Sequence, residues 1–159
     1  MVGYVDLEYA DSYVETHFLS TDDLRLSWES LGEEDKAVLL QRSFESLESL
    51  PFTGHKLDPS QPNAFPRCPY SEVPDQIKAA QVENAVALSD ESTNEDAAFY
   101  EKLWQFGDEP YSIGNLSERT SEGAWGRGST AVNGIISAKA SRLVQPYLSG
   151  GYNLRGARL

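Results

Sequence analysis

The sequence predicts a mainly α protein: a small helical bundle with a long proline-rich loop, a short β segment and an extended C-terminal tail. Apolar residues recur at helical spacing in several segments, and residues that favour helix starts precede these segments. Six of the eight prolines fall within residues 50–74, between two helical segments. A chain of 159 residues suits one domain. We expect residues 1–148 to form this domain and residues 149–159 to be a flexible tail.

Two short helices are expected near the N-terminus. Asp6 can cap the first, because an Asp side chain accepts hydrogen bonds from the first free amides of a helix. A second helix, capped by Ser20 or Thr21, should run through Trp28 and end near Gly32. The apolar face of the first helix consists of Leu7, Ala10, Val14 and Phe18.

The next two helices are expected to form the main body of the bundle. Residues 33–50 begin with three acids, which favour the positive end of a helix dipole. Their apolar stripe contains Ala37, Leu40, Phe44 and Leu47. Pro74 fits the first turn of a further helix, and the segment from Ile77 to Leu88 is rich in small apolar residues. This composition predicts a central helix that is contacted from several sides.

Shorter elements are expected beyond Asp90. Residues 97–106 predict a short helix, and residues 111–123 carry Gly, Asn and Ser, typical of turns, around a short strand. Residues 130–148 predict a last helix, with Pro146 disturbing its end. The apolar face of this helix is expected to contain Val132, Ile136, Ala140 and Leu143.

Charge divides the chain into an acidic body and a basic end. Residues 1–122 hold all 25 Asp and Glu and only 8 Lys and Arg, whereas residues 123–159 hold 5 Lys and Arg and no acid. Double-stranded DNA repels an acidic body, so only the basic end could bind it. Ordinary solubilising charge with an unspecialised tail explains the same pattern.

The sequence gives no sign of secretion, membrane insertion or enzymatic chemistry. The N-terminus lacks the charged and apolar regions of a signal peptide, and no apolar run approaches the ~18 residues that span a bilayer. His17, His55 and Cys68 do not have metal-ligand spacing, and Cys68 has no histidine-led motif of a nucleophile. We therefore expect no catalytic, metal or cofactor site and a protein that is not an enzyme. The single cysteine suits a reducing compartment.

The proline-rich loop at residues 50–74 is expected to be ordered. Proline restricts its own backbone and that of the preceding residue, so the loop loses comparatively little entropy on folding. Its apolar residues, Phe52, Leu57, Phe65 and Tyr70, also favour order. Two interpretations remain open: the loop covers the open end of the helical bundle, or it forms a binding surface.

Residues 4–90 resemble the small phage protein family of head-to-tail connectors, also called adaptor or head-completion proteins. Some members are described as DnaT-like single-stranded-DNA-binding proteins. The resemblance lies in the opening YVDLEYADSYV and in the pairing of LPFTGHK and QPNAFPR with VPDQIKAAQVENA. Farther on, YSIGNLSE is similar to the strand-like segment of the family and LVQPYL to its closing helix.

The resemblance implies a structural virion protein that forms a ring, expected to be a dodecamer, beneath the portal after DNA packaging. Its partners would be the portal protein, a tail or stopper (head-closure) protein and further copies of itself, with non-specific proximity to packaged double-stranded DNA and no membrane. It would be assembled in the host cytoplasm and located in the virion neck. Loop residues expected to support the structure are Pro51, Phe52, Gly54, Pro62, Phe65, Pro66 and Arg67.

The C-terminal segment, Ser149 to Leu159, would reach into the portal. We expect it to order only against a partner, because ordering eleven residues costs on the order of 10–20 kcal/mol of backbone entropy. The candidate portal-binding residues are Tyr152, Leu154, Arg155 and Arg158. The alternative function, single-stranded-DNA binding, predicts aromatic side chains in a basic groove, whereas the aromatics here lie almost entirely in the acidic part. A hydrolytic enzyme has no supporting constellation of residues.

Overall fold

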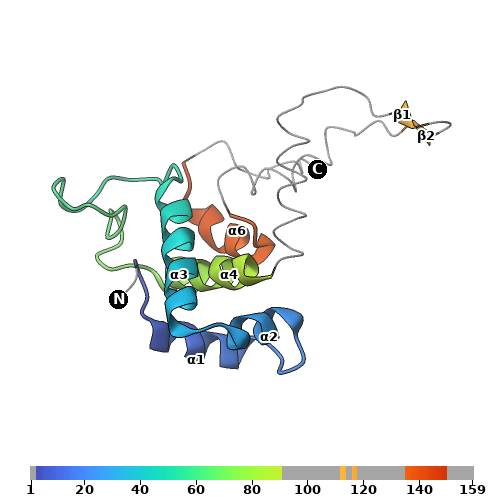
Figure 1. The fold of residues 1–159 in the computed structure, drawn as a ribbon. Coiled ribbons are helices and arrows are strands. Elements are labelled where there is room, and N and C mark those ends of the chain that lie inside the picture. Colours follow the sequence, from blue (N-terminus) through green and yellow to red (C-terminus); the bar gives the residue numbers. More distant parts are fainter. Residues whose placement is uncertain (1–2, 91–111, 114–115, 118–134, 150–159) are drawn as a thin grey trace.

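The computed structural model describes residues 3–90, 112–113, 116–117 and 135–149. It is mainly helical, which confirms the predicted fold class (Figure 1). The expected helix at residues 97–106 lies outside the described residues. The elements are α1 (Leu7–His17), α2 (Asp23–Ser30), α3 (Glu33–Glu48), α4 (Asp75–Ser89), β1 (Ser112–Ile113), β2 (Leu116–Ser117), α6 (Ala138–Val144) and the 3₁₀ turn η3 (Gln145–Tyr147). The two short strands pair antiparallel, within the segment where a strand was predicted.

Helix α1 begins as the sequence predicts, because the Asp6 carboxylate accepts a hydrogen bond from the amide of Tyr9 at 2.9 Å. Helix α2 begins later than expected. Asp22, not Ser20 or Thr21, occupies its cap position, and the Asp22 carboxylate accepts from the amide of Leu19 and so holds the turn between the two helices. Helix α2 ends at Ser30, near Gly32 as expected, and Gly32 itself lies at the start of α3.

Helix α4 is the centre of the fold, as its small apolar residues predict. Ile77 and every residue from Ala80 to Ala87 are buried. Helices α1, α2, α3 and α6 all contact α4. In Figure 1, α1 and α2 lie on one side of it and α6 on the other. Two apolar clusters result, one with α1 and α2 and the other with the proline-rich loop and residues 135–147.

Two buried amides on α4 connect it to distant segments of the chain. The Gln81 side chain accepts from the amide of Tyr4 at 2.9 Å and donates to the carbonyl of Leu40 at 3.0 Å. The Asn84 oxygen accepts from the amide of Ile136 at 2.8 Å. Because an unpaired buried polar group is costly, these bonds fix the positions of the N-terminus, α3 and the C-terminal segment around α4.

The predicted last helix is shorter than expected. Where described, residues 135–137 are not helical, and α6 begins at Ala138. The physical reason is that side chains, not helical carbonyls, accept the hydrogen bonds of these amides. The Asn84 side chain accepts from the amide of Ile136, and the Ser137 hydroxyl caps α6 by accepting from the amide of Ala140 at 3.2 Å. Pro146 lies within η3, after the helix has ended. Residues 130–134, with Val132, lie outside the described part.

Among the described residues, no helix combines the length and the apolar character needed to cross a membrane.

The first prediction concerns Asn84. We expect Asn84→Ala to lower the free energy of unfolding by about 2 kcal/mol, because the partly buried amide of Ile136 loses its acceptor. Gln41→Ala is the control, since Gln41 is exposed on α3 and its side chain bonds only to Glu45 within one helix. Urea denaturation followed by circular dichroism measures both. Equal stability of the two variants would contradict a structural role for the Asn84 bond.

Candidate functional site

The proline-rich loop, residues 50–74, packs its aromatic side chains into the core. Phe52 and Phe65 are buried, with ring centroids 4.9 Å apart in an edge-to-face arrangement. Phe65 also makes edge-to-face contacts with Tyr4 and Tyr147, both at 6.0 Å. The loop therefore covers one end of the bundle, and these buried rings are unavailable for stacking with nucleic-acid bases.

Glu48, at the end of α3, attaches the loop to the N-terminal segment. Its carboxylate accepts from the amide of Ala64 at 2.8 Å and from the hydroxyl of Tyr4. The hydroxyl of Tyr4 in turn accepts from the amide of Phe65 at 3.3 Å. Burial is the main reason why the pKa of Tyr4 lies far above its usual value, and the hydrogen bond with the anionic Glu48 adds to it.

Arg67 and Gly54 fix the turn of the loop. The Arg67 guanidinium donates to the carbonyls of Phe52 and Gly54, at 3.0 and 2.8 Å, and lies 5.6 Å from the centre of the Phe52 ring. Gly54 has φ +77°, and a Cβ atom there would lie 2.1 Å from the carbonyl oxygen of Cys68. This position therefore requires glycine for both backbone conformation and space.

Three prolines of the loop also accept hydrogen bonds through their carbonyls. Pro62 accepts from the Lys56 ammonium at 3.0 Å, and Pro66 accepts from the amide of Leu57 at 3.3 Å. Pro51 is exposed and accepts from Ser149. The structure thus brings the seven expected loop residues into one network of buried rings and hydrogen bonds.

A feature that the sequence did not reveal joins this loop to the end of the described chain. The amide and hydroxyl of Thr53 both donate to the carbonyl of Tyr147, at 2.7 and 3.0 Å. The amide and hydroxyl of Ser149 both donate to the carbonyl of Pro51, each at 2.8 Å. Phe52 and Leu148 form the antiparallel bridge between these pairs. We call residues 51–53 together with residues 147–149 the C-terminal clamp.

The clamp determines where the C-terminal segment leaves the body. It holds the chain beside the proline-rich loop at Ser149, which is the last described residue. The candidate portal-binding residues Tyr152, Leu154, Arg155 and Arg158 lie outside the described residues. No pattern in the sequence could have indicated the clamp, because all its hydrogen bonds end on main-chain carbonyls and join residues that lie almost one hundred positions apart.

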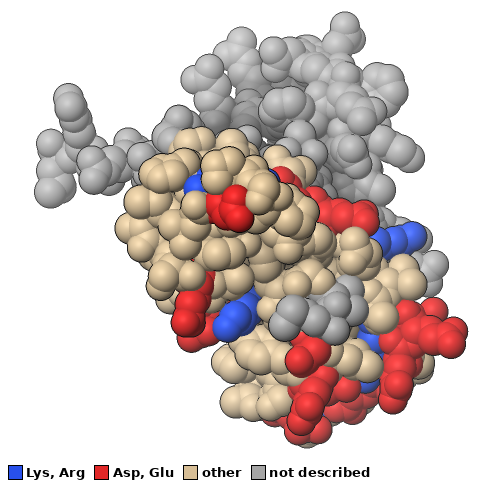
Figure 2. All heavy atoms as spheres, turned by 90° about the vertical axis from the view of Figure 1, so that its left-hand side faces the viewer, with Lys and Arg blue, Asp and Glu red and all other residues tan. Residues whose placement is uncertain are grey.

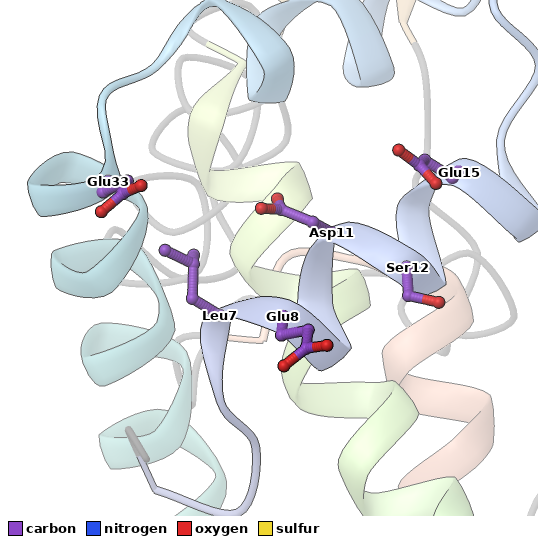
Figure 3. Close-up of a pocket in the computed structure, with 6 residues that line it drawn as sticks. All are labelled: Leu7, Glu8, Asp11, Ser12, Glu15 and Glu33. Atoms are coloured by element: carbon purple, nitrogen blue, oxygen red, sulfur yellow. The ribbon is translucent and has the colours of Figure 1, made fainter.

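The surface of the body is strongly acidic. Residues 3–90 hold 17 Asp and Glu against 6 Lys and Arg. Red side chains dominate the α1–α2 end of the face in Figure 2. An open hollow of about 460 Å³ between α1 and the start of α3 is lined by Glu8, Asp11, Glu15 and Glu33, with Leu7 and Ser12 (Figure 3).

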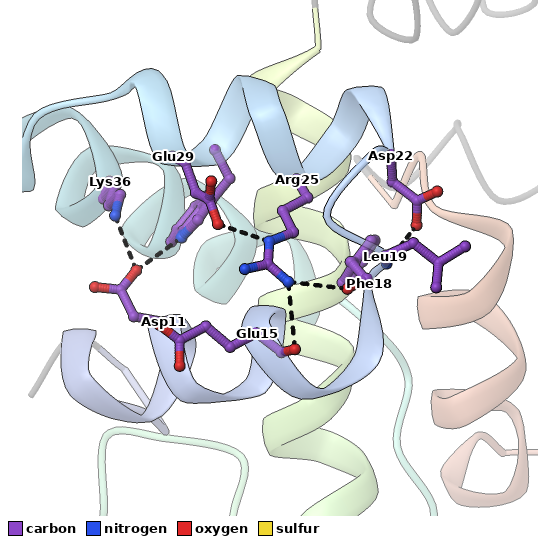
Figure 4. Close-up of polar contacts among 9 residues, drawn as sticks. Asp11, Glu15, Phe18, Leu19, Asp22, Arg25, Glu29 and Lys36 are labelled. Carbon is purple, nitrogen blue, oxygen red and sulfur yellow. Dashed lines mark hydrogen bonds and ion pairs between the residues drawn. The ribbon is translucent and has the colours of Figure 1, made fainter.

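Most described basic side chains are engaged by nearby acceptors. Lys36 forms an ion pair with Asp11 at 2.9 Å, and the same carboxylate accepts from the Trp28 indole at 2.8 Å (Figure 4). Arg25 pairs with Glu29 and also donates to main-chain carbonyls at the end of α1. Further pairs are Lys78 with Asp75 and Lys139 with the buried Glu83. The described residues therefore present no basic groove that could follow a phosphate backbone.

The remaining polar candidates have local partners. His17 is exposed, and its ring stacks on Tyr13 at a centroid distance of 3.9 Å. The Tyr13 hydroxyl donates to Glu83 at 2.8 Å. Across residues 3–90 and 135–149, no three His, Cys, Asp or Glu side chains are grouped so that they could hold a metal ion.

One comparison with known proteins gave a match. The family whose description reads "Putative DnaT-like ssDNA binding protein" matches residues 3–104. This range covers more than half of the chain and includes α1 to α4 and the whole proline-rich loop. No curated protein and no solved structure matches the chain.

The second prediction tests the loop. We expect Gly54→Ala to lower the free energy of unfolding by about 2 kcal/mol or more, because alanine combines an unfavourable backbone conformation with a clash against Cys68. Gly32→Ala is the matched control, since a Cβ atom there meets no heavy atom within 4 Å, and should cost less than about 1 kcal/mol. Thermal and urea unfolding measure both variants. A Gly54→Ala protein as stable as Gly32→Ala would contradict the described loop.

The third prediction concerns alkaline pH. Burial and Glu48 raise the pKa of Tyr4, so the folded protein holds this phenol proton more tightly than the unfolded chain, where the pKa is 10.0. The contribution of Tyr4 to stability is complete below about pH 9 and decreases as the pH rises through 10, by about 1.4 kcal/mol in total between pH 9 and pH 11. Tyr4→Phe should reduce the slope of stability against pH over this range accordingly. Urea unfolding from pH 9 to 11 provides the slopes, and identical slopes would contradict the assignment.

Proposed function

The chain belongs to the DnaT-like ssDNA-binding protein family, and within this family we propose that it is a head-to-tail connector of a tailed phage. In this role it is a non-enzymatic virion protein of the neck. It forms a dodecameric ring beneath the portal after DNA packaging and provides the attachment site for a tail or stopper protein. The observation that carries the proposal is the C-terminal clamp.

The clamp prepares the C-terminal segment for docking. It fixes residues 147–149, so the ten residues that follow start from a defined position on the body. These ten residues contain Tyr152 and Leu154, which need apolar pockets, and Arg155 and Arg158, which need carboxylates. A portal ring repeats such a site at every subunit, so a ring of connectors binds tightly through individually weak tails.

The charge of the body supports the same function. A protein that surrounds the path of packaged DNA must let the DNA slide without adhering to it. The acidic surface of residues 3–90 provides this, because phosphates repel carboxylates and the basic side chains are largely neutralised by neighbours. Contact with packaged double-stranded DNA would therefore be non-specific.

Single-stranded-DNA binding is the second candidate, and the name of the matching family favours it. The most basic part of the chain is residues 123–159, with 5 Lys and Arg and no acid. In this alternative, that segment would bind phosphates electrostatically, and the affinity would decrease steeply with salt. The two functions differ in the partner that the C-terminal segment recognises.

The fourth prediction separates these functions. The full-length chain and a chain ending at Ser149, which retains every clamp residue, are each mixed with portal rings from the same phage. We expect the full-length protein to decorate the portal as a ring and the truncated protein to bind at least about 100-fold more weakly, because it lacks the tail anchors. Sedimentation and electron microscopy measure binding and ring formation.

The controls test whether the truncated protein is folded, whether the tail anchors bind the portal, and whether the protein binds single-stranded DNA instead. Thermal unfolding of the truncated protein should match that of the full-length protein, since the clamp remains complete. Tyr152→Ala with Leu154→Ala in the full-length chain should weaken portal binding at least 10-fold without removing basic charge. If the full-length protein ignores portal rings but retains single-stranded DNA at moderate salt, the connector proposal is wrong and the alternative replaces it.

A further inference from the structure

We propose that the body, residues 3–90, carries a docking face for residues 135–149, and that this segment leaves and re-enters the face as a unit. The same segment of a second copy of the chain then fits the same face. The docking face is the surface of α4 and of the proline-rich loop against which residues 135–149 pack. We call residues 135–149 the α6 segment. The inference goes beyond the proposed function and does not rest on it.

The first observation is that the body has an apolar core of its own. The α6 segment contributes its buried side chains, Ile135, Ala140, Val144 and Tyr147, to one of the two apolar clusters. The buried residues of the other cluster all belong to the body: Val5, Ala10, Tyr13, Val14, Trp28, Leu40, Val82, Ala85 and Val86. This second cluster therefore holds α1, α2 and α3 on α4 even when the α6 segment has left.

The second observation is that the α6 segment forms local hydrogen bonds of its own. The Ser137 hydroxyl accepts from the amide of Ala140, and the Ser137 carbonyl accepts from the amide of Ser141 at 3.0 Å. At the other end, the amide of Leu148 donates to the carbonyl of Gln145 at 3.2 Å. Helices α1 to α4 lie within the body, so detachment of the segment interrupts none of them. Body and segment are separate units of secondary structure.

The third observation is that polar side chains on α4 meet the α6 segment in a fixed order. Gln76, at the start of α4, accepts from the hydroxyl of Tyr147 at 2.9 Å. Glu83 forms an ion pair with Lys139, and Asn84 accepts from the first amides of the segment. The order along α4 is the reverse of the order along the segment, so the two run antiparallel side by side (Figure 1). These bonds fix the direction and the register of docking.

Glu83 makes the docking face selective for a segment with a positive charge. Its side chain is only 5% exposed, and it accepts from the Tyr13 hydroxyl at 2.8 Å. Lys139 supplies the opposite charge, and its ammonium lies 5.5 Å from the centre of the Phe18 ring. A peptide that covers Glu83 without a cation would leave a buried carboxylate uncompensated. The ligand is therefore a short helical peptide with apolar side chains and one suitably placed lysine.

A second copy of the chain offers the same features. Each contact described above joins the body to the α6 segment, and every copy carries both partners. A segment supplied by another molecule meets the same apolar cluster, the same Glu83 and the same clamp acceptors. The difference lies in effective concentration, which favours the segment of the same chain. Weakening that segment should therefore open the face to a segment from outside.

The fifth prediction uses full-length Val144→Asp. Val144 is buried in the cluster shared by segment and body, so a carboxylate there should keep the segment off the face while the body stays folded. A fluorescent peptide of residues 135–149 should bind this variant at least 10-fold more tightly than it binds the unmodified chain, whose own segment occupies the face. The same peptide with Lys139→Glu, which opposes Glu83 with a like charge, should bind at least 10-fold more weakly. Fluorescence anisotropy measures binding, and circular dichroism reports folding.

Hydrogen exchange of the unmodified full-length chain tests the inference without a substitution in the core. Amides of residues 138–149 should exchange at least 10-fold faster than those of residues 80–87, because the segment opens while the body remains closed. Excess unlabelled peptide of residues 135–149 should speed exchange of the same residues in the chain, since the peptide takes their place on the face. Exchange within α3 should not change.

Two outcomes overturn the inference. If Val144→Asp is folded but binds the peptide no better than the unmodified chain does, the face does not accept a segment from another molecule. If Val144→Asp is unfolded, exchange of the unmodified chain decides: equal rates in residues 138–149 and 80–87, or no effect of added peptide, mean that body and segment are one cooperative unit. None of these measurements involves a portal, so the connector proposal is tested separately.

Discussion

The arrangement depends on the burial of α4 from Ala80 to Ala87. A helix enclosed on all sides cannot leave its polar side chains in water, so Gln81 and Asn84 must find partners in other segments. Gln81 bonds to the N-terminal segment and α3, and Asn84 bonds to the segment before α6. Each side-chain amide therefore determines which segment of the chain packs beside its turn of α4. Apolar contacts alone are non-directional and would not fix the positions of the surrounding segments along α4.

The sequence predicts those elements whose causes are local. The cap at Asp6, the acidic start of α3 and the small residues of α4 act within a few positions, and all three helices are found. The last helix is wrong at its start because Asn84, 52 positions earlier, competes for the amide of Ile136. The aromatics and prolines predict an ordered loop, but the long-range bonds of Glu48, Arg67 and Ser149 leave no periodic signal.

The candidate site is only partly visible in the sequence for a related reason. Counting charges gives an acidic body and a basic end, but it does not reveal that Lys36 and Arg25 are paired within the body or that Lys139 of the basic end is paired with Glu83. Pairing of this kind removes isolated positive charge from the surface and leaves the free carboxylates to determine its potential.

The C-terminal clamp also has a mechanical consequence. A pull on the residues after Ser149 first reaches the bonds between Ser149 and Pro51, before it can act on η3 or α6. The load passes from there into a loop whose backbone is stiffened by proline and fastened by Arg67 and Glu48. The segment that closes the core over α4 is thereby shielded from tension. The body can bear a pulling force at its C-terminal end while the packing around α4 remains intact.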